Sequence, residues 1–232
     1  MNYTANDNLE VMKVAKNYNG FLIKNIYKLI KKYNLKKVLD FGCSDGFFIE
    51  QLSLLDKNLH FCGIEKDKTS IEACLNKKIE IYDDLSKTNC QFDLIYSLNV
   101  LEHIENDCEI LAQFREKLSD NGKIFLYVPS LQFLFSSMDK KTGHFRRYEK
   151  KELINKVKTA GFKIEKVEFC DSIGVLATLL YIFKDKLKSN NGDINKNQIK
   201  IYDLIFPLSR LFDLVFFSKF IGKNLLLIAS KI

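Results

Sequence analysis

The sequence predicts an α/β fold built on a doubly wound sheet of mostly parallel strands. Residues 38–41 form a short apolar run that meets a glycine-rich turn and then a helical pattern, as in a β-α-β unit. Residues 60–64 begin a second such unit. Residues 92–97 are almost all apolar, as expected of a central strand that is buried on both faces. The length of 232 residues suits a single domain, residues 1–232, with additions.

The remaining elements follow from the periodicity of apolar residues, taken in chain order. Apolar positions at helical spacing predict helices, and apolar runs bounded by turn residues predict strands. The expected helices cover residues 19–33, 71–75, 104–118 and 150–160, and the expected strands cover 79–82, 123–128, 162–169 and 224–230. Residues 120–122, Asp-Asn-Gly, are expected to form the turn into the strand at 123–128.

A turn with two glycines follows the first strand. Gly42 allows the chain to leave the strand with dihedral angles that a Cβ would disfavour, and Gly46 lets a ligand approach the start of the next helix. Ser44 stands between them and adds a hydroxyl group that can donate or accept a hydrogen bond. The strand, turn and helix together predict a backbone platform for a nucleotide-like ligand.

Two other kinds of site have sequence motifs similar to this turn. Gly42, Ser44 and Gly46 also spell G-x-S-x-G, the nucleophile turn of α/β-hydrolases, but that fold needs strands upstream, where this sequence has only helical pattern. A nicotinamide-dinucleotide site expects G-x-G-x-x-G instead. Glu65 favours the nucleotide-like ligand, since it ends the second strand about 25 residues after Asp40, where a carboxylate can bind a ribose diol.

Four motifs resemble, in order and spacing, those of class I S-adenosylmethionine-dependent methyltransferases. They are V-L-D-F-G-C-S-D-G, G-I-E-K-D, F-D-L-I-Y-S-L-N-V-L-E-H-I and L-S-D-N-G-K-I-F-L-Y-V-P, within residues 38–129. The resemblance implies a seven-stranded, mostly parallel, Rossmann-like sheet with an antiparallel last strand. It also implies S-adenosylmethionine as the cofactor and S-adenosylhomocysteine as its product.

The resemblance assigns cofactor-binding roles to positions within these motifs. Glu65, with Lys66 beside it, is expected to bind the ribose, and Asp84 and Leu85 the adenine. Asn99 is expected near the methionine backbone. The residues expected at the methionine end itself are Asp40, Gly42, Ser44 and Gly46.

His103 is the candidate catalytic base, because it follows the predicted central strand at the sheet edge where ligands bind. The alternative is that it only orients Glu102 or the cofactor loop. Related ubiquinone-pathway O-methyltransferases and small-RNA end-methylating enzymes carry E-x-x-E-H, whose acids and histidine help to hold a divalent metal. Asn99 replaces the first acid here, and an amide is a poor substitute for a carboxylate, so no metal is expected.

Residues 130–149 lack helical or strand rhythm and are expected to form a substrate-side insertion. His144, Arg146, Arg147 and Tyr148 would suit an anionic or sugar-like acceptor, since arginine can bind a carboxylate or phosphate through two parallel hydrogen bonds. G-H-F-R-R-Y also resembles a segment of small bacterial methyltransferases of glycan and lipid pathways. The alternative is a surface turn in which the two arginines point apart.

Residues 171–222 are unusually apolar and are expected to form a helical insertion or lid. The first apolar run, residues 173–183, is shorter than the roughly 20 residues of a membrane span, and the second is interrupted by Pro207, Arg210, Asp213 and Lys219. The first expectation is core, lid or the surface of a homodimer. Peripheral contact with a membrane or a lipid-linked substrate is the alternative, because lysines flank both runs.

Net charge and cysteine content indicate which partners and which cellular compartment to expect. The net charge is +7, but the lysines are scattered along predicted helix faces, which disfavours nucleic acid as a partner. The six cysteines form no C-x-x-C pair and several lie in apolar patterns, which indicates a reducing compartment. The first residues show no secretory signal, so a cytoplasmic protein, peripheral to the membrane in the alternative above, is expected.

The resulting hypothesis is methyl transfer from S-adenosylmethionine to a small-molecule, sugar or lipid-linked glycan acceptor, with oxygen as the favoured acceptor atom. The methyl carbon is displaced in line, so positioning and exclusion of water matter as much as an acid or base. Two alternatives stay open: a methyltransferase of RNA or another nucleic acid, and an S-adenosylmethionine-binding protein without catalysis.

Overall fold

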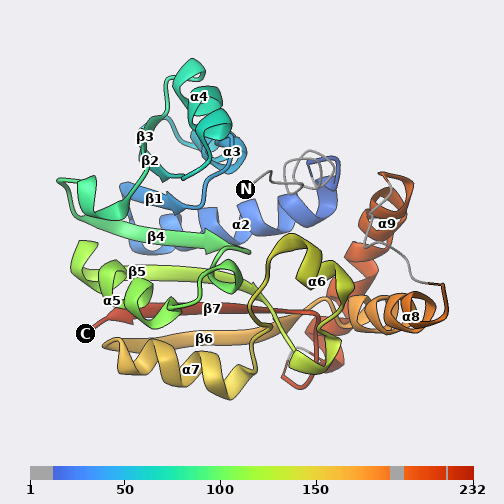
Figure 1. The fold of residues 1–232 in the computed structure, drawn as a ribbon. Helices are drawn as coiled ribbons and strands as arrows, with labels where there is room; N and C mark the ends of the chain where they lie inside the picture. The colour runs from blue at the N-terminus through green and yellow to red at the C-terminus, as the bar shows by residue number, and fades with distance from the viewer. Residues whose placement is uncertain (1–12, 189–195, 218) are drawn as a thin grey trace.

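The computed structural model describes residues 13–188, 196–217 and 219–232. Seven strands form one sheet: β1 (Lys37–Phe41), β2 (His60–Ile64), β3 (Glu80–Tyr82), β4 (Phe92–Leu98), β5 (Leu118–Pro129), β6 (Phe162–Cys170) and β7 (Asn224–Lys231). Their order is β3-β2-β1-β4-β5-β7-β6, and only β7 runs antiparallel to its neighbours in this sheet (Figure 1). The seven-stranded, mostly parallel sheet that the resemblance implies is confirmed.

Helices connect the strands and cover both faces of the sheet. The α-helices are α2 (Lys16–Tyr33), α3 (Phe47–Leu55), α4 (Lys68–Asn76), α5 (Asp107–Lys117), α6 (Ser137–Thr142), α7 (Lys150–Thr159), α8 (Ser172–Lys188) and α9 (Lys196–Phe212). Three single turns of 3₁₀-helix, η1 (Leu85–Lys87), η2 (Leu101–His103) and η3 (Gln132–Leu134), and a π-helical turn, η4 (Asp213–Phe217), complete the described elements.

Side chains that alternate along the central strands divide the core into two layers. Val38 and Leu94 pack with apolar residues of α2 and α9 on one face of the sheet. Leu39 and Ile95 follow them in the chain and pack with α5 and α7 on the other face. Since successive residues of a strand point to opposite faces, a central strand needs apolar side chains on both sides. This explains the nearly unbroken apolar run of β4.

Two elements differ from the sequence prediction. The expected turn before the strand at residues 123–128 is a bulge inside β5, because Leu118 pairs with Phe92 and Lys123 with Leu94. Residues 130–149, expected to be irregular, contain η3 and α6. α6 begins with a capping box between Ser136 and Asp139, but six residues are too few to produce a helical periodicity in the sequence.

The apolar segment 171–222 contains α8, α9 and η4. These helices and α6 lie beyond the end of the sheet toward which β4 points (Figure 1). α9 is anchored to α2 by aromatic contacts, with the ring centroids of Tyr18 and Phe206 5.4 Å apart. Among the described residues, no helix is both long enough and apolar enough to cross a bilayer.

Candidate functional site

The glycine-rich turn lies at the point where the winding of the sheet reverses. β1 stands between β2 and β4, and open α/β sheets bind ligands outside the carboxyl ends of their strands at such a point. Gly42, Ser44 and Gly46 all have left-handed backbone angles, with φ of 82°, 50° and 81°. A Cβ on Gly42 would also collide with the side chain of Val100. Glycine is therefore required at this position for both conformation and space.

Glu65 is fixed at the end of β2 by the backbone of the turn. One carboxylate oxygen accepts a hydrogen bond from the backbone N of Ser44 at 2.8 Å. The other accepts from the backbone N of Lys66 at 2.8 Å and of Asp67 at 3.1 Å. The side chain of Lys66 is exposed, and Lys66 contacts Glu65 through its backbone N. Glu65 thus holds the turn against β2 and places an anionic group at the edge of the sheet.

Asp84 and Leu85 lie after the next strand, β3. The Asp84 carboxylate accepts hydrogen bonds from the backbone N of Ser86 at 2.8 Å and from its Oγ at 2.6 Å. These hydrogen bonds lower the pKa of Asp84, and they cap η1. Leu85 is buried in the main core, beneath the edge that Asp84 occupies. The adenine-binding role of the two residues stays a prediction.

Asp40 lies below the turn and not on its open side. Its side chain is almost fully buried and accepts a hydrogen bond from the Tyr96 hydroxyl at 2.8 Å. Burial raises the pKa of Asp40 to about 8, so the carboxyl group is mostly protonated at neutral pH. In this position Asp40 supports the turn from inside the core, and direct contact with the methionine end of a cofactor stays a prediction.

Asn99 ends β4 at the same edge of the sheet. It has a left-handed φ of 54°, and its backbone N donates to the carbonyl oxygen of Tyr127 at 2.8 Å. Its side-chain amide donates to the hydroxyl of Tyr18 at 3.1 Å, which brings the start of α2 to the site. The carboxyl ends of β1, β2, β3 and β4 thus supply Gly42, Glu65, Asp84 and Asn99 to one edge.

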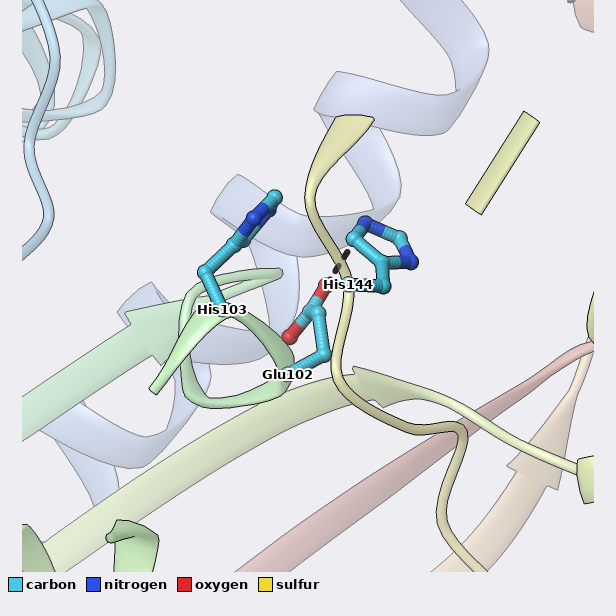
Figure 2. A group of neighbouring side chains, drawn as sticks. All are labelled: Glu102, His103 and His144. Atoms are coloured by element: carbon cyan, nitrogen blue, oxygen red, sulfur yellow. Dashed lines mark ion pairs between the residues drawn. The ribbon is translucent and has the colours of Figure 1, made fainter. Parts of the chain in front are cut away.

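Glu102, His103 and His144 form a compact cluster next to this edge (Figure 2). One ligand atom from each residue can be chosen so that all three atoms lie within 4.8 Å of one another. Glu102 is fully buried, and neither of its carboxylate oxygens has a hydrogen-bond partner in the structure. Burial raises the pKa of Glu102 to about 8. An orphaned buried carboxyl group beside two imidazoles is a donor set that fits a divalent cation.

Asp139 fixes the orientation of His144 in this cluster. The Asp139 Oδ1 is 2.8 Å from His144 Nδ1 and 2.9 Å from Arg147 Nε. An ionised carboxylate can only accept hydrogen bonds, so His144 Nδ1 carries a proton, and in the neutral form of the ring it is Nε2 that has the lone pair. Nε2 lies 3.9 Å from Glu102 Oε1. A carboxylate behind a histidine in this way is the usual support of a metal-binding imidazole.

No local sequence pattern predicts that His144 belongs to this cluster, since His144 comes from the segment after α6, whereas Glu102 and His103 come from η2. The expectation that no metal binds rested on Asn99 alone, and it stays a prediction. The signal available in the sequence was the E-H pair together with a later histidine in an irregular segment. That signal becomes specific only when the fold brings the two segments together.

His103 packs edge to face against His144, with ring centroids 4.5 Å apart. Burial and the neighbouring imidazole lower the pKa of His103 to about 4. The ring is therefore neutral at neutral pH, and in this structure it is a weaker base than a free histidine. Its assignment as the catalytic base stays a prediction, and its position beside the cofactor edge is consistent with that role.

Arg146, Arg147 and Tyr148 are already paired within the protein. Arg146 Nη1 lies 2.9 Å from Asp107 Oδ2, and the Tyr148 hydroxyl donates to the same oxygen at 2.7 Å. Arg147 is buried against Asp139, so the two guanidinium groups point to different acids. Arg147 is paired only through Nε, since its Nη1 is buried without a hydrogen-bond partner. The role of the two arginines in binding an anionic acceptor stays a prediction, and for Arg146 it would require the ion pair with Asp107 to open.

Comparisons with known sequences agree with the fold. The sequence model of the methyltransferase domain family matches residues 14–167. A mitochondrial ubiquinone biosynthesis O-methyltransferase of Schizosaccharomyces pombe is 30% identical over 101 residues, which cover 39% of this chain and 37% of that protein. A tRNA (guanine-N(7)-)-methyltransferase of Mycoplasma capricolum subsp. capricolum is 33% identical over 102 residues, 38% of this chain and 46% of that protein. The matched part thus spans less than half of each relative.

Solved structures share the architecture. Magnesium protoporphyrin IX methyltransferase from Synechocystis PCC 6803, solved with bound SAH, has a TM-score of 0.58 at 11% identity, and the alignment covers 96% of this chain and 86% of that one. At this identity the likeness shows the shared fold alone. The family match, however, covers well over half of the 232 residues. The chain therefore belongs to the class I S-adenosylmethionine-dependent methyltransferase family.

Proposed function

We propose that the protein transfers a methyl group from S-adenosylmethionine to an oxygen atom of a small-molecule, sugar or lipid-linked acceptor. The observation that carries the proposal is Glu65, whose carboxylate is held at the end of β2 by three backbone N–H groups of the turn and its own strand exit. A fixed carboxylate at this place suits a ribose diol. The bound cofactor would supply an electrophilic methyl group on a sulfonium.

The residues of the chain would act mainly by positioning. The left-handed turn at Gly42, Ser44 and Gly46 would bind the methionine end through its backbone, and Asp84 would accept a hydrogen bond from the adenine amino group. An acceptor hydroxyl must lose its proton as it becomes methylated. His103 is a residue of a suitable type at this edge, and it would take that proton. The S. pombe relative, named as an O-methyltransferase, supports oxygen as the acceptor atom.

The alternative is a nucleic-acid methyltransferase, which the likeness to the M. capricolum tRNA enzyme and the net charge of +7 favour. Binding to RNA through phosphate groups falls steeply with salt, because counterions are released. Retention on RNA at low salt that disappears as salt is raised would support this alternative. Indifference to RNA at low salt would remove it. A protein that binds S-adenosylmethionine but methylates no acceptor is the remaining alternative.

Calorimetric titration with S-adenosylmethionine and S-adenosylhomocysteine tests the proposed function. Glu65→Ala should weaken the affinity for both about tenfold or more, since a hydrogen bond to a charged group contributes about 1.5–3 kcal/mol. Glu72→Ala is the matched control, because Glu72 is an exposed acid on α4, outside the predicted site. Since Glu65 also holds the turn, circular dichroism should confirm that the variant is folded. Failure of the folded wild type to bind either compound would refute the proposal.

A further inference from the structure

α8, α9 and η4 each expose large apolar side chains to solvent. Leu180 and Phe183 of α8 are 63% and 64% exposed, and Leu204 and Leu208 of α9 are 77% and 51% exposed. Leu214 of η4 is 70% exposed. We call the surface that carries these five residues the apolar face. Single exposed leucines are ordinary, but a group on two neighbouring helices marks an interaction surface.

Three acids in or next to these helices, Asp171, Asp203 and Asp213, point into the protein. Asp203 accepts hydrogen bonds from two backbone N–H groups at the start of α2, and Asp213 accepts two at the start of α8. Asp171 accepts from the backbone of Gly174 and from the Tyr202 hydroxyl. All three acids are buried. Their carboxylates are thus used to cap helices and to join α8 to α9, and they contribute no negative charge to the apolar face.

The exposed charges of the described part of this segment are positive. Lys184, Lys200 and Lys219 are exposed, whereas Asp185 is only half-exposed. Among the described residues of the segment from α8 to β7, every fully exposed charged side chain is a lysine. An exposed apolar surface with a lysine rim is the pattern of helices that lie in the boundary between headgroups and acyl chains. Anionic headgroups would complement the lysines.

A hollow of about 170 Å³ lies between α8 and α9 and has mostly apolar walls. Ile173 and Ala177 line it from α8, and Ile201, Ile205 and Phe206 line it from α9. The hollow therefore has the chemistry of a site for a hydrocarbon chain. The helix that carries it is linked to the candidate site, because the Tyr181 hydroxyl of α8 lies 3.1 Å from the Ser137 Oγ of α6, the helix that leads to His144.

We propose that the apolar face docks on the surface of a membrane that contains anionic lipid. A second copy of the chain fits the face less well, because a twofold interface places the same surface on both sides and would bring the lysine rims together. A membrane supplies apolar depth and negative charge at once. The proposal goes beyond methyl transfer, and its test measures lipid binding alone, so it can fail or succeed independently of the proposed function.

Co-sedimentation with vesicles tests this proposal. The wild type should sediment with vesicles of equimolar phosphatidylcholine and phosphatidylglycerol, and less with phosphatidylcholine alone. Leu204→Glu and Leu208→Glu should each reduce the partition coefficient about tenfold or more, since burying one leucine contributes about 1.5–3 kcal/mol. Leu54→Glu is the matched control, because Leu54 is a leucine of α3 that is 73% exposed and lies outside the apolar face. Its partition should equal that of the wild type.

Three results would overturn the proposal. The first is a folded wild type that does not sediment with the mixed vesicles at low salt. The second is an equal loss of binding in Leu54→Glu, which would mean that any added negative charge acts at long range. The third is a lipid-free dimer, detected by light scattering, that Leu204→Glu converts to a monomer. That result would assign the apolar face to a second copy of the chain.

Discussion

Asp139 joins α6 to the segment that carries His144. The substitution Asp139→Asn removes the charge of this side chain and keeps its shape. The carboxylate accepts hydrogen bonds from the backbone N and Oγ of Ser136, from His144 Nδ1 and from Arg147 Nε. An asparagine side chain has one acceptor oxygen in place of two. At least one buried donor would lose its partner, and the buried guanidinium of Arg147 would lose its counter-charge.

The size of the effect follows from the pKa of Asp139. Burial alone would raise this pKa, but the hydrogen bond from His144 and the charge of Arg147 outweigh burial and lower the pKa from 3.8 to about 2. A tenfold change in proton affinity corresponds to about 1.4 kcal/mol, so the carboxylate contributes about 2.5 kcal/mol to the free energy of unfolding. Breaking a buried ion pair costs about 3–5 kcal/mol. We expect Asp139→Asn to lower the free energy of unfolding by about 2–4 kcal/mol at neutral pH.

Urea denaturation over a range of pH measures this loss. Because the pKa of Asp139 is lower in the folded state, its contribution is complete above about pH 4 and disappears as the pH falls toward about 2. The difference between wild type and variant should thus be constant at neutral pH and shrink in acid. Asp120→Asn, at an exposed acid in the β5 bulge, should have no effect at any pH. A loss below about 1 kcal/mol, or one that persists in strong acid, would refute the reasoning.

Two further predictions concern buried carboxyl groups of the candidate site. Asp40→Asn should raise the free energy of unfolding by more than about 1 kcal/mol at pH 8. The gain should grow as the pH rises from about 4, because the folded protein favours the protonated acid. A gain that does not depend on pH in urea denaturation would contradict this prediction. Mn²⁺ or Zn²⁺ should raise the melting temperature of the wild type, because the Glu102 oxygens lack a hydrogen-bond partner and lie beside two imidazoles. EDTA should reverse this increase, and Glu102→Gln should abolish it. An unchanged melting temperature of the wild type would instead uphold the expectation from Asn99 that no metal binds.

The core of the fold could be predicted because its signals are local. The strand, turn and helix around Gly42 and the apolar run of β4 lie in short stretches, and the four motifs fix their order. The helix α6 could not be predicted, since six residues are too few to show a helical periodicity and its Asp139 is held by groups of the loop that follows. The bulge in β5 could not be predicted, because its Asp-Asn-Gly sequence is typical of a turn.

The candidate site was predicted to the extent that it depends on strand ends. Glu65 and Asp84 follow strands whose carboxyl ends meet at one edge, so their proximity follows from a parallel sheet. The cluster of Glu102 and His144 depends on how two loops meet, and no periodicity encodes that. The pairing of Arg146 with Asp107 was equally invisible, because it joins residues far apart in the sequence.

The place of β7 in the sheet has a consequence for synthesis of the chain. β7 pairs with β5 on one side and β6 on the other, so that Ser230 lies opposite both Lys123 and Lys163. Until residues 224–231 have left the ribosome, β5 and β6 each have an open edge that can pair with another strand. Translation must therefore pass residue 231 before β7 can pair fully with both neighbours, and a stall before that point would leave an intermediate prone to aggregate.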